Sequence, residues 1–599
     1  MPARTNPKTD IKSITPFLGM MTDKGSSINR KPGHFDLLDN VFSNLDEIKK
    51  RKGYTKYVNT DTTGSLVYGL HNQISAEGLN FNQVKLVSGS SNLYFYDIAT
   101  ADWIQFTGHT FPTSDTDFVE MDGFDEWNGS TNISETVKAG ASHTTTDVIL
   151  GSATGPWPDN SLVGEVARFT HSASSVEYKE IIGNYNDGTD DHILFSDDDP
   201  LNGVPADSVA IKIREKGNML YIGGGAEYGV IGTEEASGAI SSGASPDGYR
   251  QLDGTSYAHD GFSGIESHGN RIFGWYDRTL RFSDLYNGHN FGINSYFQFS
   301  SNVRGAKAFN DNVIIIYESR RIWALIGVNP SSWELRLIND DIGCNYIKTV
   351  ANYNSTSYAM QIFVASDGNV RAITSDNFKQ ISRETKMLSL TDQYIKDELS
   401  ASLNFACAGV DEEGKYTVFQ TDQTFYTLNV AASERTRFRE MIWSTGYTAN
   451  GFGVAKKMSG SLVLGSDSNG QLYKWNDGND DDGTAISTTI RRRGINFDSL
   501  GDKTKFKRID IAQGVKNDST TITVKCEANN SGNAATIEHT LGTHDPSTGD
   551  KLHSYKIPNN PSNGEGTGHM IDYEITENSS VEVAPIEDIT FRYRPGLLK

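Results

Sequence analysis

The sequence predicts an all-β protein, a β-propeller of about six blades with an inserted small β-domain and a C-terminal β platform domain. Short β-rich runs recur along the chain at a spacing close to the roughly 40–50 residues of a propeller blade. Aromatic residues make up 10% of the chain, and its 58 glycines favour many short strands joined by tight turns. At 599 residues, the chain is also longer than one hydrophobic core normally organises.

Residues 1–60 are expected to form an N-terminal arm that precedes the first blade. The first 57 residues contain 11 Lys and Arg against 6 Asp and Glu, and a dense basic run occupies Lys49, Lys50, Arg51 and Lys52. Residues 1–10 are polar and lack the apolar core of a secretory signal, so we expect synthesis in the cytoplasm. No stretch approaches roughly 18 consecutive apolar residues, so no direct membrane insertion is predicted.

The first blade is predicted at residues 61–109, where four β-rich runs follow each other from Leu66 to Phe106. The remaining blades are predicted within residues 216–495, in similar units that begin at Gly264, Val303, Ile347, Phe405 and Gly451. A short helix is expected from Thr391, in the segment TDQYIKDELSASL. Core packing between blades is the expected role of five tryptophans, Trp103, Trp275, Trp323, Trp443 and Trp475.

An inserted β-domain is predicted at residues 110–215, because the blade spacing breaks there and new strand-like runs appear. This range contains 20 Asp and Glu against 5 Lys and Arg, so it carries −15 of the net charge of −22. After the triple arginine at 491–493, the strands alternate without blade spacing, which predicts the C-terminal β-domain at residues 496–599. The overall negative charge argues against a conventional nucleic-acid binder.

The sequence offers no convincing catalytic, metal or cofactor site, so we predict a protein that is not an enzyme. Cys344, Cys407 and Cys526 are far apart and odd in number, which favours buried, reduced thiols. The aspartate runs at 197–199 and 480–482 lack the spacing of a calcium-binding EF-hand loop. Nucleophile elbows, HExxH zinc helices, Walker loops and Rossmann glycine patterns are absent from convincing contexts.

Three segments resemble the tail nozzle proteins of podoviruses, also described as tail tubular protein B or phage stabilisation proteins. The N-terminal segment from Ile14 to Tyr57 matches their opening at Asp39, Asn40, Val41, Lys50, Arg51, Gly53 and Tyr54. A blade signature of this family is matched at Arg271, Ile272, Phe273, Ser283, Asp284 and Phe291. The third segment, KAFNDNVIIIYESRRIWAL from Lys307, looks like the blade that follows in the family.

The resemblance implies a structural subunit of a phage tail, located in the virion and assembled in the host cytoplasm. Such a subunit forms a homohexamer beneath the head-to-tail adaptor protein and the portal, ends the DNA-ejection channel and contacts tail fibres or spikes. Viral DNA would pass through without sequence-specific binding. The acidic insert would then build the nozzle tip and present a negative wall, with the candidate channel residues Asp187, Asp190, Asp191, Asp197, Asp198 and Asp199.

Other interpretations remain open on the sequence. The acidic surface of the insert can equally serve to keep a β-rich assembly soluble and its strand edges apart. The chain can also be a receptor-binding or glycan-processing phage tail propeller, since GSDSNGQLYKW from Gly465 vaguely resembles the aspartate box of sialidase-type propellers. A non-viral propeller that serves as an interaction scaffold is a further alternative, although the long acidic insert argues against it.

Overall fold

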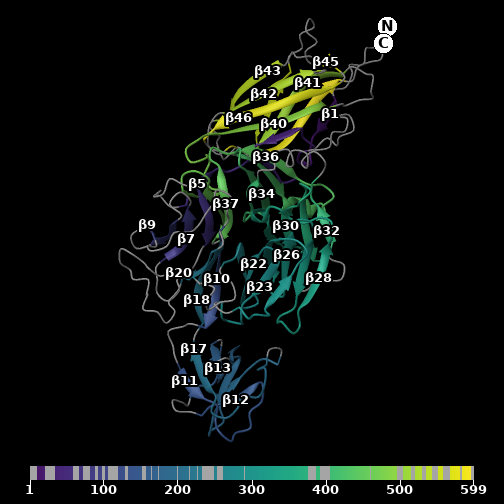
Figure 1. Ribbon diagram of the computed structural model, residues 1–599. Helices are drawn as coiled ribbons and strands as arrows, with labels where there is room; N and C mark the ends of the chain where they lie inside the picture. The colour runs from purple at the N-terminus through teal and green to yellow at the C-terminus, as the bar shows by residue number, and fades with distance from the viewer. Residues whose placement is uncertain are drawn as a thin grey trace, which may run out of the picture. The chain divides into compact units, whose positions relative to one another are not determined.

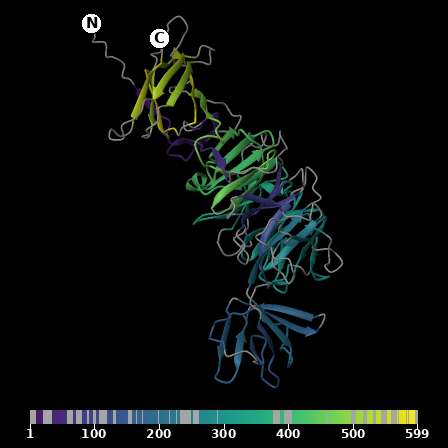
Figure 2. The same cartoon turned by 90° about the vertical axis from the view of Figure 1, so that its left-hand side faces the viewer.

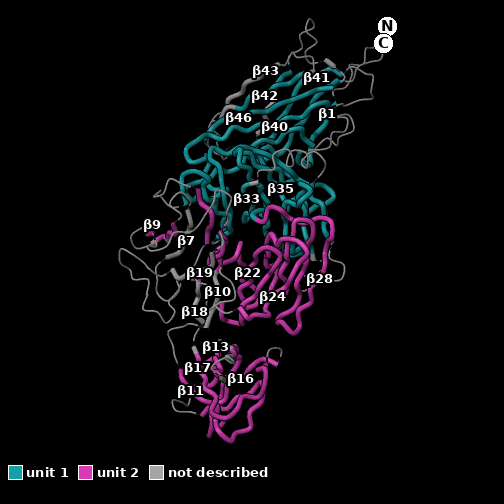
Figure 3. The backbone as a smooth tube through the Cα atoms, in the orientation of Figure 1, with its two compact units in different colours: residues 1–61, 348–376, 385–599 teal, residues 62–347, 377–384 magenta. Residues whose placement is uncertain are grey.

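The structure is a computed structural model in which nearly all of the regular secondary structure of the described residues is β-strand, arranged in many small sheets (Figure 1). The predicted all-β class is therefore confirmed. The chain divides into two compact units (Figure 3), of which unit 1 contains residues 1–61, 348–376 and 385–599, and unit 2 contains residues 62–347 and 377–384. The structure describes residues 10–20, 34–57, 66–71, 81–87, 92–97, 102–105, 119–127, 133–151, 157–163, 165–172, 175–197, 200–214, 216–224, 227–231, 249–251, 261–288, 291–375, 386–391, 405–458, 460–495, 504–513, 520–528, 535–541, 551–557, 567–568, 570–580, 583 and 585–594.

Unit 2 contains four sheets in which four antiparallel strands follow one another in chain order. The first joins β6 (Val67–His71), β7 (Phe81–Val87), β8 (Asn92–Asp97) and β9 (Asp102–Gln105). The second joins β10 (Val119–Trp127), β18 (Lys216–Gly224), β19 (Glu227–Ile231) and β20 (Tyr249–Gln251). The third joins β21 (Gly264–His268), β22 (Arg271–Tyr276), β23 (Thr279–Phe282) and β24 (Tyr296–Gln298). The fourth joins β25 (Val303–Asn310), β26 (Val313–Glu318), β27 (Ile322–Ile326) and β28 (Glu334–Asn339).

Unit 1 contains three further groups of four strands. The first is β29 (Ala351–Asn354), β30 (Ala359–Val364), β31 (Val370–Ser375) and β32 (Lys386–Ser389). The second is β33 (Phe405–Val410), β34 (Lys415–Gln420), β35 (Thr424–Asn429) and β36 (Trp443–Tyr447). The third begins with β37 (Phe452–Met458), β38 (Ser461–Ser466) and β39 (Leu472–Trp475). The third group is completed from the other end of the chain, because β5 (Tyr54–Lys56) pairs with β39.

The strands follow from short apolar runs separated by tight turns. Strand β26 has the sequence VIIIYE and is buried along its whole length, as expected for a continuous β-branched run covered on both faces. The turn between β21 and β22 consists of Gly269 and Asn270, both with positive φ, at 56° and 55°. Two such residues form the type I′ turn that matches the twist of a hairpin.

Outside the segment between β10 and β18, the described residues therefore contain seven four-stranded groups, against the about six blades that the sequence predicts. The additional group is the sheet of β10 and β18–β20, whose first strand lies within the range predicted for the insert, residues 110–215. Strand β10 contains four acidic residues, and it pairs with β18 over its full length, from Val119 opposite Gly224 to Trp127 opposite Lys216. A strand this acidic, whose partner follows the insert, gives no blade-like pattern in the sequence.

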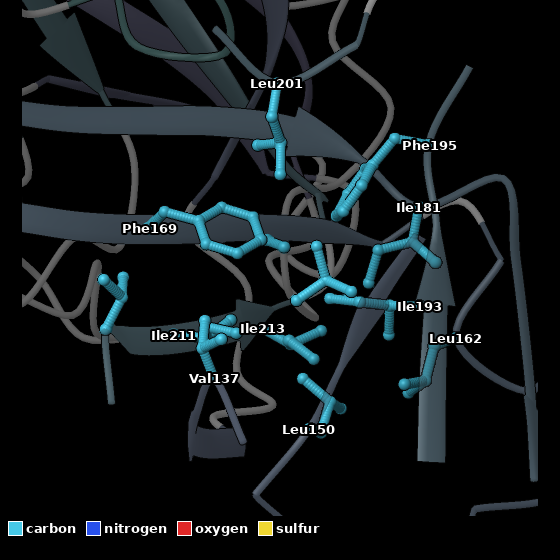
Figure 4. Close-up of a cluster of buried hydrophobic side chains, with 13 residues drawn as sticks. Val137, Leu150, Leu162, Phe169, Ile181, Ile193, Phe195, Leu201, Ile211 and Ile213 are labelled. Atoms are coloured by element: carbon cyan, nitrogen blue, oxygen red, sulfur yellow. The ribbon is translucent and has the colours of Figure 1, made fainter. Parts of the chain in front are cut away.

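Between β10 and β18, the chain forms two small sheets around their own core (Figure 4). One sheet joins β11 (Ile133–Thr136), β17 (Ala210–Arg214), β13 (Val166–Ser172) and β14 (Ser175–Glu180). The other joins β12 (Asp147–Ile149), β16 (Asp191–Leu194) and β15 (Gly183–Asn186). The buried cluster includes Val137, Leu150, Phe169, Ile193 and Ile211. The insert thus has a hydrophobic core of its own.

Two larger sheets of unit 1 combine strands from both ends of the sequence (Figures 1 and 2). One contains β1 (Asp10–Ser13), β3 (Val41–Ser43), β4 (Ile48–Lys50), β41 (Thr504–Gln513), β44 (Lys551–Lys556), β45 (Thr567–Gly568) and β47 (Ile586–Arg594). The other extends the β33–β36 group with β2 (Leu37–Asp39), β40 (Ile486–Ile495), β46 (Ile571–Ser579), β42 (Thr520–Ala528) and β43 (Ala535–Leu541). The N-terminal strands therefore belong to the same sheets as the strands of the predicted C-terminal domain, residues 496–599.

Other sequence predictions concern single residues. The three cysteines are free and buried, so the prediction of buried thiols is confirmed. Four of the five tryptophans are buried, and Trp323 is partly buried against the core of its sheet. The helix predicted from Thr391 lies mostly outside the described residues. The structure describes instead a short helix α2 (Val430–Arg435), which begins after Asn429. No helix in the described ranges is long and apolar enough to cross a membrane.

Candidate functional site

The candidate site is a polar cavity of about 440 Å³ in unit 1, beside the basic run of the N-terminal segment. Six cationic and only two acidic side chains line this cavity, together with four asparagines. Its wall comes from the β3–β4 hairpin, the β33–β34 turn, helix α2 and the segment after β39. The lining residues are Phe42, Asn44, Glu47, Lys49, Lys50, Arg51, Lys52, Glu413, Lys415, Asn429, Ala431, Ala432, Arg435, Asn476, Asn479 and Val583. We call it the basic pocket.

Arg51, in the wall of the basic pocket, has no hydrogen-bond donor left for a ligand. Its Nη1 and Nη2 donate to the two carboxylate oxygens of Asp481 at 2.7 and 2.6 Å, and its Nε donates to Asn40 Oδ1 at 2.8 Å. The other two N–H groups reach the carbonyl oxygens of Lys52 and Tyr447. A guanidinium has five N–H donors, so all are used. The side chain is completely buried, and its role is structural.

Lys50 is likewise committed to internal contacts. Its ammonium donates to Glu577 Oε2 at 2.9 Å and to the carbonyl oxygen of Ser579 at 2.6 Å. Burial lowers the pKa of Lys50, although Glu577 opposes that shift. These contacts join β4 to the end of β46. Near this strand, burial also raises the pKa of Asp39 from 3.8 to about 6, an effect that Arg51 only partly offsets.

Lys415 is the buried ammonium that remains incompletely satisfied. Its side chain is 7% exposed, it forms an ion pair with Glu413, and its Nζ lies 4.5 Å from the centre of the Phe42 ring. The Glu413 side chain is 51% exposed at the rim of the cavity. Partial burial of Glu413 favours its neutral form, but Lys415, Lys52 and Lys49 outweigh this effect and lower its pKa. Three ammonium groups therefore act on one carboxylate.

The outer charges of the basic pocket are more accessible. Lys49 is 56% exposed and lies 3.5 Å from Glu47. Lys52 is exposed, and no ion pair of its ammonium occurs among the described residues. Arg435 donates to Asp46 Oδ2 at 2.8 Å and to the carbonyl oxygen of Asn44. Lys49 and Lys52 are therefore the cations of this site that can approach a bound group.

The acidic residues predicted for the channel lie in and after the β15–β16 hairpin of the insert. Asp187 Oδ1 accepts hydrogen bonds from the backbone N–H groups of Thr189 and Asp190, which lowers the pKa of Asp187. Asp190 forms an ion pair with Lys138. Asp191 is buried and accepts a hydrogen bond from Asn186. Asp197 is exposed, whereas Asp198 and Asp199 lie outside the described residues.

A histidine occupies the space between two carboxylates in the same hairpin. His192 Nδ1 lies 2.9 Å from Asp147 Oδ1, and its Nε2 lies 3.6 Å from Asp187 Oδ2. The ring stacks on Tyr185 at a centroid separation of 4.4 Å. The described part of the chain contains no group of three or more His, Cys, Asp or Glu side chains placed to hold a metal ion. These contacts fix the hairpin internally.

The second aspartate run, residues 480–482, also has a structural role. Asp481 holds Arg51, and Asp480 Oδ1 accepts the backbone N–H of Gly483 at 2.9 Å. Asp482 lies 3.8 Å from Lys56. The chain of Gly53 passes so close that a Cβ atom there would lie 1.6 Å from the Asp480 carbonyl oxygen. Glycine is therefore required for this contact.

An enclosed cluster of charges joins the first strands of three sheets in unit 2. The Lys307 ammonium on β25 lies 2.5 Å from Glu120 of β10 and 3.0 Å from Glu266 of β21. Burial would lower the pKa of Lys307, but the two carboxylates outweigh it and raise that pKa. Burial also raises the pKa of Glu266, with Lys307 opposing and Asp122 adding to the shift. Glu120 of β10 is thus compensated by a residue far along the chain.

Residues of the second family-like segment meet in one local cluster. Ser283 and Ile272 exchange hydrogen bonds, from Ile272 N to Ser283 Oγ and from Ser283 N to the Ile272 carbonyl oxygen, both at 2.9 Å. Arg271 donates to the carbonyl oxygen of Ser283 at 2.6 Å. Phe273 and Phe291 are buried. These matched residues stabilise the β22–β23 hairpin and have no catalytic geometry.

Sequence reasoning missed part of the basic pocket. It identified the run from Lys49 to Lys52 but not Glu413, Lys415 or Arg435, which come from segments far along the chain. The only sequence signal was the density of the basic run itself. The segment DEEGK at 411–415 resembles any acidic hairpin turn, and only the fold shows that its glutamate and lysine face the basic run.

Comparison with known proteins identifies no family. No family model matches the chain, and no curated protein matches it. Among solved structures, it is similar to BamB from Moraxella catarrhalis, with 10% sequence identity and a TM-score of 0.32 over 70% of this chain and 97% of that one. It is also similar to BBS1N in complex with ARL6DN, with 8% identity and a TM-score of 0.27 over 59% of this chain and 98% of that one.

Proposed function

We propose that the chain is a structural, non-enzymatic tail nozzle subunit of a short-tailed bacteriophage. In this role, it assembles as a homohexamer, attaches to the head-to-tail adaptor and portal complex, and forms the distal end of the DNA-ejection channel. Tail fibres or spikes contact its surface. The protein belongs to the virion, and viral DNA passes through the channel without sequence-specific binding.

The observation that carries the proposal is the architectural role of the residues that resemble the nozzle family. Asn40, Lys50, Arg51 and Gly53 make the contacts that hold the N-terminal segment in unit 1. Tyr54 packs edge-on against Tyr473, with the ring centres 5.0 Å apart. A set of residues that serves only packing fits a structural subunit better than an enzyme. The three family-like segments together are the basis for naming the nozzle.

We also propose that the seven four-stranded groups are the blades of one β-propeller. Support comes from the first strands of consecutive groups, which contact each other in chain order. In unit 2, β10 contacts β6 and β21, and β21 contacts β25; in unit 1, β33 contacts β29 and β37. Radial packing of successive small sheets is the defining feature of a propeller. Strand β5 would then close the ring by completing the last blade.

The acidic insert is proposed as the nozzle tip. Its separate hydrophobic core allows it to form a distinct body, and residues 133–214 contain 13 Asp and Glu against 5 Lys and Arg, which is −8 of the net charge of −22. A negative wall repels phosphate groups and reduces their adhesion while DNA moves past. Asp197 is an exposed candidate for that wall, whereas Asp187, Asp190 and Asp191 are engaged in contacts within the hairpin.

Electron microscopy of the purified chain, alone and with its adaptor protein, tests this function. The proposal expects a sixfold ring with an axial channel. A monomeric disk that cleaves glycans would instead support the receptor-binding or glycan-processing alternative and overturn the nozzle. Removal of residues 133–214 provides a second readout, because the ring should persist and only its distal density should be lost.

A further inference from the structure

The cationic side chains of the basic pocket differ in how many hydrogen bonds and ion pairs they already form within the protein. Arg51 and Lys50 are committed to Asp481, Glu577 and main-chain oxygens. Arg435 is paired with Asp46. Lys415 forms an ion pair with Glu413, and Lys52 is exposed and forms no ion pair among the described residues. Lys49 is 56% exposed and lies 3.5 Å from Glu47. An ammonium group has three donors, and among the described residues Lys415 forms a single hydrogen bond through its Nζ, to Glu413.

Glu413 shows what kind of group this site accepts. Its backbone is fixed, because Asp411 Oδ1 accepts the N–H of Glu413 at 3.0 Å and that of Lys415 at 2.9 Å. Its side chain is half exposed and is not enclosed by other groups. A rotation of that side chain would break its ion pair with Lys415 without any change in the strands. Glu413 is thus an intramolecular carboxylate ligand that another carboxylate can replace.

The remaining lining favours carboxylate over phosphate. Phosphate sites typically use arginine forks or the free N–H groups of a helix N-terminus. In this pocket, every Arg51 donor is used, and the Asn429 side chain already accepts the N–H of Ala432 at the start of α2. The apolar lining of Phe42, Ala431, Ala432 and Val583 suits the methylene groups of an acidic side chain.

We propose that the basic pocket binds the acidic side chains of a glutamate- or aspartate-rich segment from a partner protein. Glu413 occupies the site in the free protein and is displaced on binding. The net charge of −22 does not prevent this, because charges beyond a Debye length of about 8 Å are largely screened at physiological ionic strength. The inference rests on the pocket alone, so it does not depend on the proposed role in a phage tail.

Fluorescence anisotropy with a labelled hexaglutamate peptide and the full chain tests the inference. Glu413→Gln removes the internal competitor, so it should tighten binding by up to about fivefold, the upper end expected for a solvent-exposed ion pair. Lys52→Gln should weaken binding. The matched control is Lys457→Gln, an exposed lysine of β37 outside the pocket, which should leave the affinity unchanged. A hexaglutamine peptide should not bind.

Three results would contradict the inference. If Glu413→Gln leaves the affinity unchanged or weakens it, Glu413 is not a competitor and the inference fails. It also fails if Lys457→Gln weakens binding as much as Lys52→Gln, because peptide binding then depends only on the net charge of the protein. Absence of hexaglutamate binding by both the parent and Glu413→Gln, with binding of inorganic phosphate, would assign the pocket to a different anion. All the exchanged residues are exposed, so the variants should fold.

Discussion

The basic run at residues 49–52 and the acidic hairpin at residues 187–191 use their charges differently. In the basic run, the two inner residues, Lys50 and Arg51, make their contacts inside unit 1, whereas the two outer residues, Lys49 and Lys52, are exposed at the pocket. In the hairpin, Asp187, Asp190 and Asp191 are all engaged by neighbours in the insert. A dense cluster of like-charged residues in the sequence therefore does not show how many of its side chains can contact a partner.

The largest expected effect concerns the buried end of the basic run. Arg51→Met leaves the Asp481 carboxylate buried without its partner, which should cost about 3–5 kcal/mol of unfolding free energy. Urea denaturation of the full chain measures this loss. The adjacent Lys52→Met is the control and should change the free energy by less than about 0.5 kcal/mol. Similar losses for the two variants would contradict the division of this run into structural and free charges.

A smaller effect is expected at Asp39, the acidic residue beside Arg51. Its pKa is raised from 3.8 to about 6, so the folded state holds this proton more tightly than the unfolded state. The penalty for ionising Asp39 therefore develops as the pH rises from about 4 to about 6. Asp39→Asn should be more stable than the parent at pH 7, by up to about 3 kcal/mol.

The pH dependence of unfolding distinguishes an effect of Asp39 ionisation from an effect of side-chain packing. Denaturation at pH 4 and at pH 7 should show a gain for Asp39→Asn only at the higher pH. An equal gain or loss at both values would mean that the Asp39 side chain acts through packing and not through its proton.

The smallest expected effect concerns the acidic hairpin. Lys138→Met removes the partner of Asp190, a partly exposed ion pair, and should reduce local stability by about 0.5–1 kcal/mol. Hydrogen exchange of the β15 and β16 amides reports this local opening. Addition of 1 M salt should shrink the difference, and the exposed Asp197→Asn should show none. A salt-independent loss would assign Lys138 a packing role.

The sequence predicted the local features of this molecule better than its long-range ones. Runs such as VIIIYE at 313–318 identify strands because burial on both faces requires a continuous apolar segment. Strand β10 was not recognised because Glu120 is compensated by Lys307, which no local pattern reveals. Helix α2 had one local signal, Asn429, a favourable residue for capping a helix start. Pairing of β5 with β39 depends on partners that only the fold brings together.

The basic pocket also combines a local sequence pattern with residues from distant parts of the chain. Its run of lysines was recognisable, but its chemistry depends on Glu413 and Lys415, which lie in a turn that the sequence presents as an ordinary solvated hairpin. In the insert, the excess of acidic residues is visible in the sequence, but the range 110–215 also counts the four acidic residues of β10, which belongs to another sheet. Which of those residues remain exposed depended on Lys138, Asn186 and the backbone of the turn.

The contact between Arg51 and Asp481 also has a consequence for biosynthesis. The two residues are 430 positions apart in the chain. At about 5–20 residues per second, a ribosome needs about 20–90 s to make the second residue after the first. During that interval the carboxylate partner of Arg51, the strand that pairs with β5 and the ring of Tyr473 beside Tyr54 have not yet been made. Slow translation should therefore lengthen the time during which proteases and holdase chaperones can reach the N-terminal segment. The hairpins should be affected less, because their pairing strands are synthesised soon after each other.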